Sequence, residues 1–393
     1  MKIFFTQTAY LPSIGGAQIH LHQLAKLLAD HHEVKVACFW TKTRTDWLLG
    51  TTLLAPGGEP YELDGVYVTP MVYTQEEKIR LFPWVILYYI FQYQAIRKIA
   101  EILLPKLRLI GDEADIVHHG RVGREPLAYA SLMLARELEK PFVLNPYHHP
   151  RWSSRFYRSY QRLYPLADAV FALTHAEGRM LEKFGVKPEK IFVTGTGGIN
   201  STDYDPLRFR NHYGLFGPIV LFIGQKYPYK GFLQILRAAP LVWEKQPDVH
   251  FVFLGPRTNY SRRIFLKNHD PRVVELDTVS LEEKTSALAA CDILCVPSTQ
   301  ESFGGVYIEA WQMGKPVIGS DIATVSEVIR HGIDGFVGPP SPSFLADAIL
   351  HLINNPILRG QMGEAGKQRA EAEFSWSRIA QKTELIYQQL LKG

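Results

Sequence analysis

Residues 298–319 read STQESFGGVYIEAWQMGKPVIG, and this stretch decides how the second half of the chain folds. The apolar run Ile293 to Val296 comes before it and predicts a buried strand, which Pro297 ends. A polar loop follows, and a helix is expected to begin near Gly304 and to end at Gly314, before a second apolar strand. In open α/β sheets, ligands bind at such a loop, between the carboxyl end of a parallel strand and the amino end of a helix.

The loop carries groups that suit a nucleotide sugar. Free N–H groups at the start of the helix favour a phosphate, and Gly304 and Gly305 let the backbone approach it closely. Glu301 lies in the loop and Glu309 lies in the helix, so both carboxylates can address one ligand. Since carboxylates beside a phosphate would repel it, we expect them to accept hydrogen bonds from sugar hydroxyls. The stretch therefore predicts a nucleotide-sugar site.

The pair Glu301-x7-Glu309 within Glu-Ser-Phe-Gly-Gly, followed by Gly-Lys-Pro-Val, resembles the signature of the retaining glycosyltransferases of family 4. The resemblance implies the GT-B fold and transfer of a sugar from a nucleoside-diphosphate donor, UDP- or GDP-linked, with retained anomeric configuration. The acceptor would be a glycan, a lipid or a small molecule. The resemblance also implies that Glu301 holds sugar hydroxyls and Glu309 the ribose. The donor site would further include Ser302, Phe303, Gly304 and Gly305.

Length and composition favour a globular protein of two domains. The chain has 393 residues and a net charge of +4, which is too small to argue for nucleic acid as a partner. Its three cysteines make no disulfide framework and indicate a reducing compartment. No apolar run reaches transmembrane length and the amino terminus reads as a strand, so we expect a cytoplasmic protein, with a peripheral contact at the inner face of the membrane left open.

Strands and helices alternate along the chain in two successive series, one in each half. This alternation predicts an α/β protein with two Rossmann-like, doubly wound domains, which the GT-B resemblance places across a central cleft. The expected division is an acceptor-side domain at residues 1–205, a donor domain at residues 206–374, and a helix at residues 375–393 that returns to the first domain.

The first strand and helix of the chain lack Gly-x-Gly-x-x-Gly, which argues against a dinucleotide cofactor, and no other cofactor is expected. By resemblance, Gly15 and Gly16 reach the donor diphosphate, although a tight turn alone would also explain them. Tyr10 and Gln18 line the same turn and are acceptor-side candidates.

Two histidine pairs follow predicted strands. His118 matches one position of a family histidine motif and is a further acceptor-side candidate. His148 follows the strand 141–144 and matches the family histidine at the reacting sugar, with His149 beside it. A histidine at a strand end can instead simply bond the backbone.

An arginine series follows, at positions 151, 155, 158 and 162, and its spacing predicts one helical face. Arg151, the first of them, is an acceptor-side candidate. The face would meet anionic lipid headgroups or a phosphate-bearing acceptor, or it is solvated and paired with acidic neighbours. Residues 76–104 read as a helix interrupted near Pro83, whose aromatic middle is either buried or a membrane or acceptor contact.

The second domain restarts with a strand at residues 219–223 and the loop GQKYPYKG from Gly224 to Gly231. In family 4, an arginine and a lysine of this loop clamp the donor phosphates; Lys230 matches the lysine, and Gln225 replaces the arginine. Lys226 is a candidate to supply the lost charge, as a point charge without the planar fork of arginine, and the sequence leaves open whether it does so. As an alternative, Lys230 is an ordinary lysine at a helix start.

Together these residues imply a mechanism with His148, Glu301 and Lys230 as the catalytic set and with no bound metal. The lysines and the helix end would stabilise the leaving diphosphate. Three rivals remain: a retaining glycosidase, which has no use for a diphosphate site; a nucleotide-sugar epimerase of the same fold; and a non-catalytic sugar-nucleotide binding protein.

Overall fold

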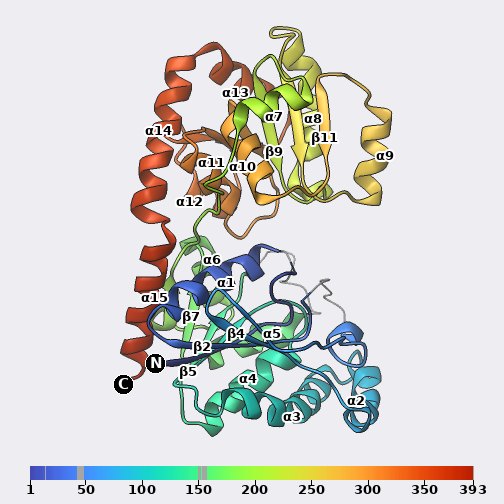
Figure 1. The fold of residues 1–393 in the computed structure, drawn as a ribbon, viewed down its shortest axis with the longest axis vertical. Coiled ribbons are helices and arrows are strands. Elements are labelled where there is room, and N and C mark those ends of the chain that lie inside the picture. Colours follow the sequence, from blue (N-terminus) through green and yellow to red (C-terminus); the bar gives the residue numbers. More distant parts are fainter. Residues whose placement is uncertain (14, 42–47, 149–151, 153–156, 393) are drawn as a thin grey trace. The chain divides into compact units, whose positions relative to one another are not determined.

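The structure is a computed structural model that describes residues 1–13, 15–41, 48–148, 152 and 157–392 (Figure 1). The chain forms two compact units. Unit 1 contains Met1–Gly195 and Trp376–Gly393, and unit 2 contains Thr196–Ser375. Each unit has a sheet of its own with helices on both faces.

Unit 1 contains an eight-stranded sheet in the order β3-β4-β2-β1-β5-β6-β7-β8, in which only the β3–β4 pair is antiparallel. The strands are β1 (Lys2–Thr6), β2 (Glu33–Cys38), β3 (Tyr61–Leu63), β4 (Val66–Pro70), β5 (Ile116–Gly120), β6 (Phe142–Asn145), β7 (Ala169–Ala172) and β8 (Ile191–Val193). The order reverses between β1 and β5. A doubly wound sheet opens its ligand crevice at such a switch point, outside the carboxyl ends of the strands.

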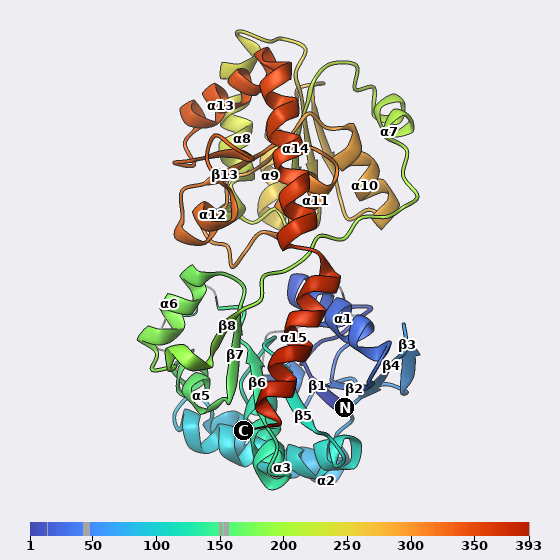
Figure 2. The ribbon, with the colours of Figure 1, turned by 90° about the vertical axis from the view of Figure 1, so that its left-hand side faces the viewer.

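The helices of unit 1 are α1 (Gly16–Ala29), α2 (Gln75–Leu87), α3 (Gln92–Gly111), α4 (Pro126–Glu137), α5 (Arg158–Leu163), α6 (His175–Lys183) and α15 (Trp376–Leu390). Helices α1 and α15 pack side by side and share a core with one face of the sheet (Figure 2). Helices α2, α3 and α4 form the larger core on the other face. The last helix of the chain therefore completes the unit in which the chain begins.

Unit 2 contains a six-stranded parallel sheet in the order β11-β10-β9-β12-β13-β14. The strands are β9 (Ile219–Ile223), β10 (His250–Leu254), β11 (Val273–Leu276), β12 (Ile293–Val296), β13 (Val317–Ser320) and β14 (Gly335–Gly338). Its switch point lies between β9 and β12. The two loops that the sequence analysis selected, after residues 223 and 296, follow these two neighbouring strands.

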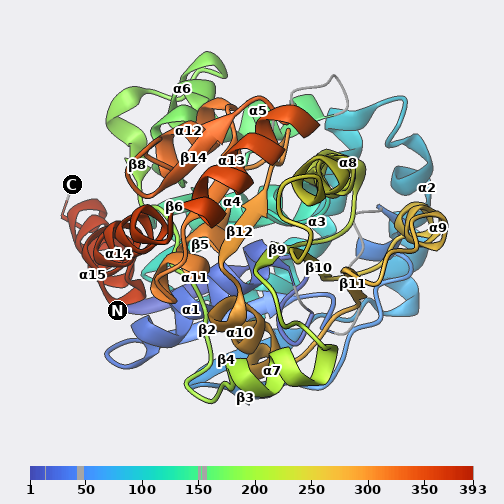
Figure 3. The ribbon, with the colours of Figure 1, turned by 90° about the horizontal axis from the view of Figure 1, so that it is seen from above.

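The helices of unit 2 are α7 (Pro206–Tyr213), α8 (Phe232–Trp243), α9 (Asn259–Lys267), α10 (Leu281–Ala290), α11 (Gly305–Gln312), α12 (Ala323–Val328), α13 (Pro342–Asn354) and α14 (Pro356–Glu373). Helix α8 packs on α13, α7 packs on α10, and α11 packs on α14 (Figure 3). The four central strands, β9, β10, β12 and β13, are almost fully buried, which explains their continuous apolar sequences.

The division between the units lies earlier than the boundary expected at Asp205–Pro206. The segment after Gly195 is bonded to unit 2: the backbone N–H of Ser201 donates to Thr285 Oγ1 at 2.9 Å, and that of Asp205 donates to Ser286 Oγ at 2.9 Å. These hydrogen bonds hold the segment on α10, so it is part of unit 2.

The predicted interruption at Pro83 is wrong. Helix α2 continues through Pro83 to Leu87, and the break before α3 falls at residues 88–91. Pro83 is exposed, so the carbonyl that loses its amide partner lies on the solvent side of the helix. Among the helices of the described residues, none is both long enough and apolar enough to cross a membrane.

Candidate functional site

The two loops at the switch point of unit 2 touch each other. The backbone N–H of Thr299 donates to Tyr229 O at 2.8 Å. Gly231 has a φ of +84°, and a Cβ there would lie 2.4 Å from Pro297 O, so only glycine fits this close approach. The two loops therefore form one surface at the carboxyl edge of the sheet.

This surface brings together two of the predicted site residues. Lys230 Nζ lies 2.5 Å from Glu301 Oε2, and their side chains are 21% and 15% exposed. The hydroxyl of Thr324 donates to Glu301 O at 2.8 Å and fixes the loop backbone. A cation and a carboxylate at one edge of the crevice can serve a phosphate and a sugar hydroxyl of the same ligand.

The amino end of α11 lies in the same loop. Its N-cap is Gly304, with φ +88°, and no side chain caps this end. The hydroxyl of Tyr307 donates to Val296 O at 2.6 Å, so the first turn is anchored to β12. Phe303 is buried against Phe374, with ring centroids 5.5 Å apart, and therefore offers a ligand only its backbone. Ser302, between Glu301 and Phe303, is partly exposed.

Glu309 lies on α11 and is held by residues far away in the sequence. Lys284 Nζ on α10 lies 2.7 Å from Glu309 Oε1 and donates to Ile199 O at 2.8 Å. Asn200 Nδ2 donates to Glu309 O at 2.9 Å, and a Cβ on Gly198 would lie 2.9 Å from Glu309 N. Sequence reasoning missed Lys284, because only the packing of α10 beside α11 gives this lysine a partner.

Lys226 does not replace the arginine that Gln225 removes, which corrects the sequence-based expectation. Lys226 is fully buried: its Nζ donates to Gly255 O and Leu276 O at 2.5 Å each and lies 2.8 Å from Glu275 Oε1. Burial lowers the pKa of this amine. The ammonium group of Lys226 therefore contacts three oxygen atoms of the protein and is not available to a ligand. These contacts fix the loop that follows β9.

In unit 1, α1 begins at Gly16, after the loop that follows the carboxyl end of β1. Gly15 is the N-cap, no side chain caps the helix, and a Cβ on Gly15 would lie 2.5 Å from Gln18 Oε1. The side-chain amide of Gln18 is buried, with no hydrogen-bond partner on either atom. Gly16, by contrast, has open space where a Cβ would stand.

Tyr10 and His118 are structural residues, contrary to the prediction that they face an acceptor. The hydroxyl of buried Tyr10 bonds His22 Nδ1 at 2.9 Å. His118 Nε2 bonds Asn145 Oδ1 at 2.6 Å, and its Nδ1 bonds the hydroxyl of Tyr387 on α15. Burial lowers the pKa of His118 to about 3, so it is a neutral core histidine that ties α15 to the sheet.

His148 follows β6, but its ring is buried. Its Nδ1 lies 3.1 Å from the hydroxyl of Tyr164, and its backbone N–H donates to Glu177 Oε1 at 2.5 Å. Burial raises the pKa of Glu177 to about 7. A contact of His148 with the reacting sugar stays a prediction.

His149, Arg151 and Arg155 lie outside the described residues, so the predicted four-arginine helix face is described only in part. Helix α5 begins at Arg158, and both Arg158 and Arg162 are exposed.

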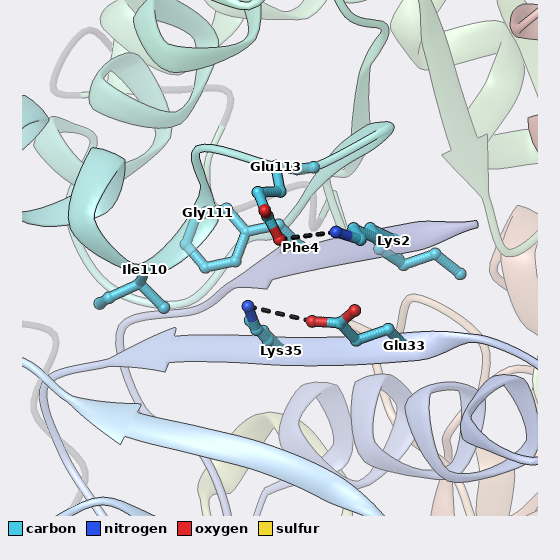
Figure 4. Close-up of a pocket in the computed structure, with 9 residues that line it drawn as sticks. Lys2, Phe4, Glu33, Lys35, Ile110, Gly111 and Glu113 are labelled. Carbon is cyan, nitrogen blue, oxygen red and sulfur yellow. Dashed lines mark hydrogen bonds and ion pairs between the residues drawn. The ribbon is translucent and has the colours of Figure 1, made fainter.

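A small hollow lies at the other edge of unit 1, beside the amino ends of β1 and β2 (Figure 4). Lys2 Nζ lies 2.6 Å from Glu113 Oε2, and Lys35 Nζ lies 3.0 Å from Glu33 Oε1. Since its charges pair with each other and it lies away from the switch point, this hollow is not the functional site.

Comparisons with known proteins agree with this geometry. A family model described as Glycosyltransferase Family 4 matches residues 14–197, and one described as Glycosyl transferases group 1 matches residues 217–355. The chain is 31% identical over 173 residues to an uncharacterized glycosyltransferase of Methanocaldococcus jannaschii, covering 43% of this chain and 48% of that protein. It is 32% identical over 179 residues to the phosphatidyl-myo-inositol mannosyltransferase of Mycobacterium leprae, covering 45% and 48%. The chain thus spans about half the length of the curated relatives it matches.

Solved structures match over the whole chain. The structure of Anabaena HepE in complex with UDP has a TM-score of 0.74 and 20% identity, and the match covers 99% of this chain and 100% of HepE. WaaG, a glycosyltransferase involved in lipopolysaccharide biosynthesis, has a TM-score of 0.62 and 16% identity, with 98% and 99% covered. These matches show the fold. The chain belongs to the family 4, group 1 glycosyltransferases, and its fold is GT-B.

Proposed function

We propose that the protein transfers a sugar from a nucleoside-diphosphate donor to an acceptor with retention of anomeric configuration. The observation that carries the proposal is the Lys230–Glu301 pair, 2.5 Å apart, at the switch point of unit 2 and beside the uncapped start of α11. A lysine and a helix end suit a diphosphate, and the carboxylate suits the hydroxyls of the attached sugar. Among similar structures, HepE has been solved with UDP-glucose, which supports a UDP-linked donor; a GDP-linked donor is the alternative.

In this proposal, Lys230 and the start of α11 stabilise the negative charge that grows on the leaving diphosphate. Glu301 holds sugar hydroxyls, and Glu309, set by Lys284, holds the ribose. The bond from the anomeric carbon to the phosphate oxygen breaks, and a bond to the acceptor oxygen forms on the same face. The departing phosphate oxygen takes the acceptor proton. Gly15, Gly16 and Gln18 belong to the acceptor-side unit, and His148 is the proposed contact of the reacting sugar.

A panel of UDP- and GDP-sugars, each with and without candidate acceptors, tests this proposal. We expect nucleotide release that depends on an acceptor, and a product whose anomeric proton coupling matches that of the donor. Interconversion of donor epimers without any acceptor would instead establish the epimerase. Donor binding with no turnover of any kind would establish the non-catalytic binding protein.

Sugar transfer should continue in EDTA, because Lys230 and the start of α11 stabilise the negative charge of the diphosphate without a metal ion. Loss of transfer in EDTA that manganese restores would contradict this.

We also propose that unit 1 meets an anionic lipid surface through α2, which would bring the enzyme to a lipid acceptor. One face of α2 places Leu81, Val85 and Tyr88 in the core. A second face of the helix is apolar and exposed: it comprises Ile79, Phe82 and Ile86, with Ile79 73% exposed. Ile90, in the turn that follows the helix, is also 73% exposed. Exposed apolar side chains gathered in this way are typical of an interaction surface.

The residues around this face favour anionic lipid as the cover. Arg80 and Arg97 are exposed on α2 and α3, and the guanidinium of Arg162 on α5 lies 5.9 Å from the ring centre of Tyr93. Apolar side chains bordered by arginines match the acyl-chain and headgroup layers of an anionic membrane surface.

A further inference from the structure

A pocket lies at the switch point of unit 1, between the loops that follow β1 and β5. It is lined by Ala17, Arg121, Val122, Gly123, Arg124, Tyr147, Trp152 and Tyr157. The position is where a doubly wound sheet binds its ligand. Within the GT-B fold this unit is the proposed acceptor side, so the pocket bears on what the acceptor is.

Arg121 is buried in the wall of this pocket and is only 3% exposed. Its guanidinium lies 4.1 Å from the ring centre of Trp152 and 4.1 Å from that of Tyr160, and Nη1 donates to the hydroxyl of Tyr164 at 2.7 Å. Among the described residues, no carboxylate lies within ion-pair distance of Arg121. The aromatic rings therefore hold the guanidinium in place without neutralising its charge.

Arg124 lines the same pocket and is also without an acidic partner in the described part of the chain. Its Nε is buried with no hydrogen-bond partner, and its guanidinium lies 5.4 Å from the ring centre of Tyr157. Leaving a buried cation or a buried N–H group unpaired costs free energy, so such groups normally have a partner.

The two nearest carboxyl groups do not neutralise these arginines. Glu177 accepts the backbone N–H groups of His148 and Leu173, at 2.5 and 2.7 Å. Glu125 accepts the hydroxyl of Tyr88 at 2.5 Å, and burial raises its pKa. Neither carboxyl forms an ion pair with Arg121 or Arg124 among the described residues, so the two guanidinium groups can bind an anion from outside the chain.

Neutral polar groups without partners lie beside the pocket as well. Thr8 Oγ1, on the loop after β1, is buried and unbonded, and a Cβ on Gly123 would lie 3.2 Å from it. The amide of Gln18, one residue beyond Ala17 in the pocket wall, is likewise buried and unbonded. These groups can bond hydroxyls of a ligand whose anionic part is at the arginines.

We infer that this pocket binds a phosphate or carboxylate of the acceptor, held by Arg121 and Arg124, so that the acceptor is an anionic molecule. The inference rests on the proposed transferase function and adds the chemical class of its second substrate. Arginine suits the role because its planar fork donates two parallel hydrogen bonds to such an anion. Phosphate could be part of a lipid headgroup or of a water-soluble molecule, and the experiment separates these sources.

The test begins with titration of the protein with inorganic phosphate by calorimetry. The titration is done with and without saturating UDP, because UDP occupies the proposed phosphate site of unit 2. We expect phosphate binding that persists in UDP. Arg124→Gln should weaken that binding roughly ten- to a hundred-fold, as expected for loss of one charged hydrogen-bonding partner. Arg108→Gln, which changes an exposed arginine of α3 in the same unit, should leave it unchanged.

Arg121→Lys provides a second variant, since it keeps the charge and loses the planar stacking against Trp152 and Tyr160; we expect intermediate binding. Equal thermal unfolding midpoints would verify that the variants are folded. Absence of phosphate binding in UDP, or equal binding by Arg124→Gln and Arg108→Gln, would overturn the inference.

Vesicles separate the two sources of the anion. The readout is competition with phosphate, because α2 is itself proposed to bind anionic vesicles whatever residue stands at position 124. If phosphatidylinositol vesicles abolish the binding of phosphate to the wild type, a lipid headgroup is the source. If phosphate still binds the vesicle-bound protein with full affinity, the acceptor is a soluble phosphate. These results are distinct from a failure of the proposed transferase function. If the protein neither binds UDP nor transfers any sugar, the proposed function is wrong. If it transfers sugar but its phosphate binding does not depend on Arg121 and Arg124, only the present inference is wrong.

Discussion

Lys230 and Glu301 form an ion pair, with Nζ and Oε2 2.5 Å apart, although 71 positions separate them in the sequence. They meet because β9 and β12 are neighbours in a parallel sheet, so the loops after them share one edge. The pair stands at the only reversal of strand order in that six-stranded sheet, where the fold opens its ligand crevice. Each side chain therefore holds the other in position for a ligand.

The first prediction concerns the coupling of these two residues. Lys230→Ala should raise the donor KM and lower kcat, with a loss of roughly one to four kcal/mol of transition-state stabilisation. Glu301→Gln should lower kcat more than it changes donor affinity. Since each variant also releases its partner, the double variant should lose less than the sum of the two single losses. Steady-state kinetics of the four proteins measures this, with Lys245→Ala as the exposed control; strictly additive losses would show that the pair does not act as a unit.

The second prediction concerns Glu309 and the lysine that sets it. Glu309→Gln should weaken UDP binding about tenfold with little change in kcat, because a ribose contact acts equally in the ground and transition states. Lys284→Gln should also weaken UDP binding, because the substitution removes the contacts of Lys284 with Glu309 and with the carbonyl of Ile199. Titration calorimetry with UDP checks both. Glu282→Gln, exposed on the same helix α10, is the control, and unchanged UDP binding by Glu309→Gln would place the ribose elsewhere.

The third prediction concerns the dependence of stability on pH. Burial raises the pKa of Glu177 to about 7 in the folded protein, from 4.5. The folded state therefore holds this proton more tightly than the unfolded state does, so its contribution to the free energy of unfolding is full below pH 4.5 and is lost as the pH rises through 7. The loss is at most about 3 kcal/mol.

Glu177→Gln carries no titrating proton, so the difference in unfolding free energy between wild type and this variant should fall between pH 5 and pH 8. Urea unfolding at several pH values measures that difference. Glu182→Gln, an exposed change on the same helix α6, should give a difference that stays flat. A flat difference for Glu177→Gln too would mean that its carboxyl ionises normally.

The fourth prediction concerns the outer face of α2. Wild-type protein should float with vesicles rich in phosphatidylglycerol and not with phosphatidylcholine alone, and the binding should weaken as salt rises. Phe82→Ser with Ile86→Ser should abolish flotation, because it removes the apolar centre of the face. Leu109→Ser is the matched control, since Leu109 is an exposed apolar residue of α3 in the same unit. Flotation that survives the double change would assign the face to a different partner.

The sequence by itself determined the fold class and the position of the two candidate ligand loops, which follow β9 and β12. The apolar runs, the glycines and the alternation of strand and helix are local patterns, and each predicts its own element without knowledge of the rest of the chain. Glu301 and Lys230 could therefore be predicted from the sequence as residues of one site. Both follow strands, and parallel strands bring their carboxyl ends to one edge of the sheet. The start of α11 at Gly305 was predicted on the same ground.

Only the tertiary structure decided which of the charged and polar residues are available to a ligand. Lys226 and Lys230 stand in one loop, yet packing buries the first against Glu275 and leaves the second beside Glu301. Tyr10 and His118 follow or end strands as ligand residues do, but His22 and Tyr387, distant in sequence, make them part of the core. Burial and pairing arise from contacts between distant segments, and no local pattern encodes them.

The same reason explains what sequence reasoning missed. Arg121 and Arg124 follow a predicted strand, but only the stacking of Arg121 on Trp152, the unbonded Nε of Arg124 and the lack of an ion pair with a carboxylate of the described residues make them a candidate site. For residues 76–104 the sequence predicted only an aromatic middle; the exposed apolar face at Ile79, Phe82 and Ile86 depends on α3 and α4 filling the core beside α2. The sequence thus determined where elements form and which edge carries ligands, and the packing of distant segments decided which side chains remain free to bind them.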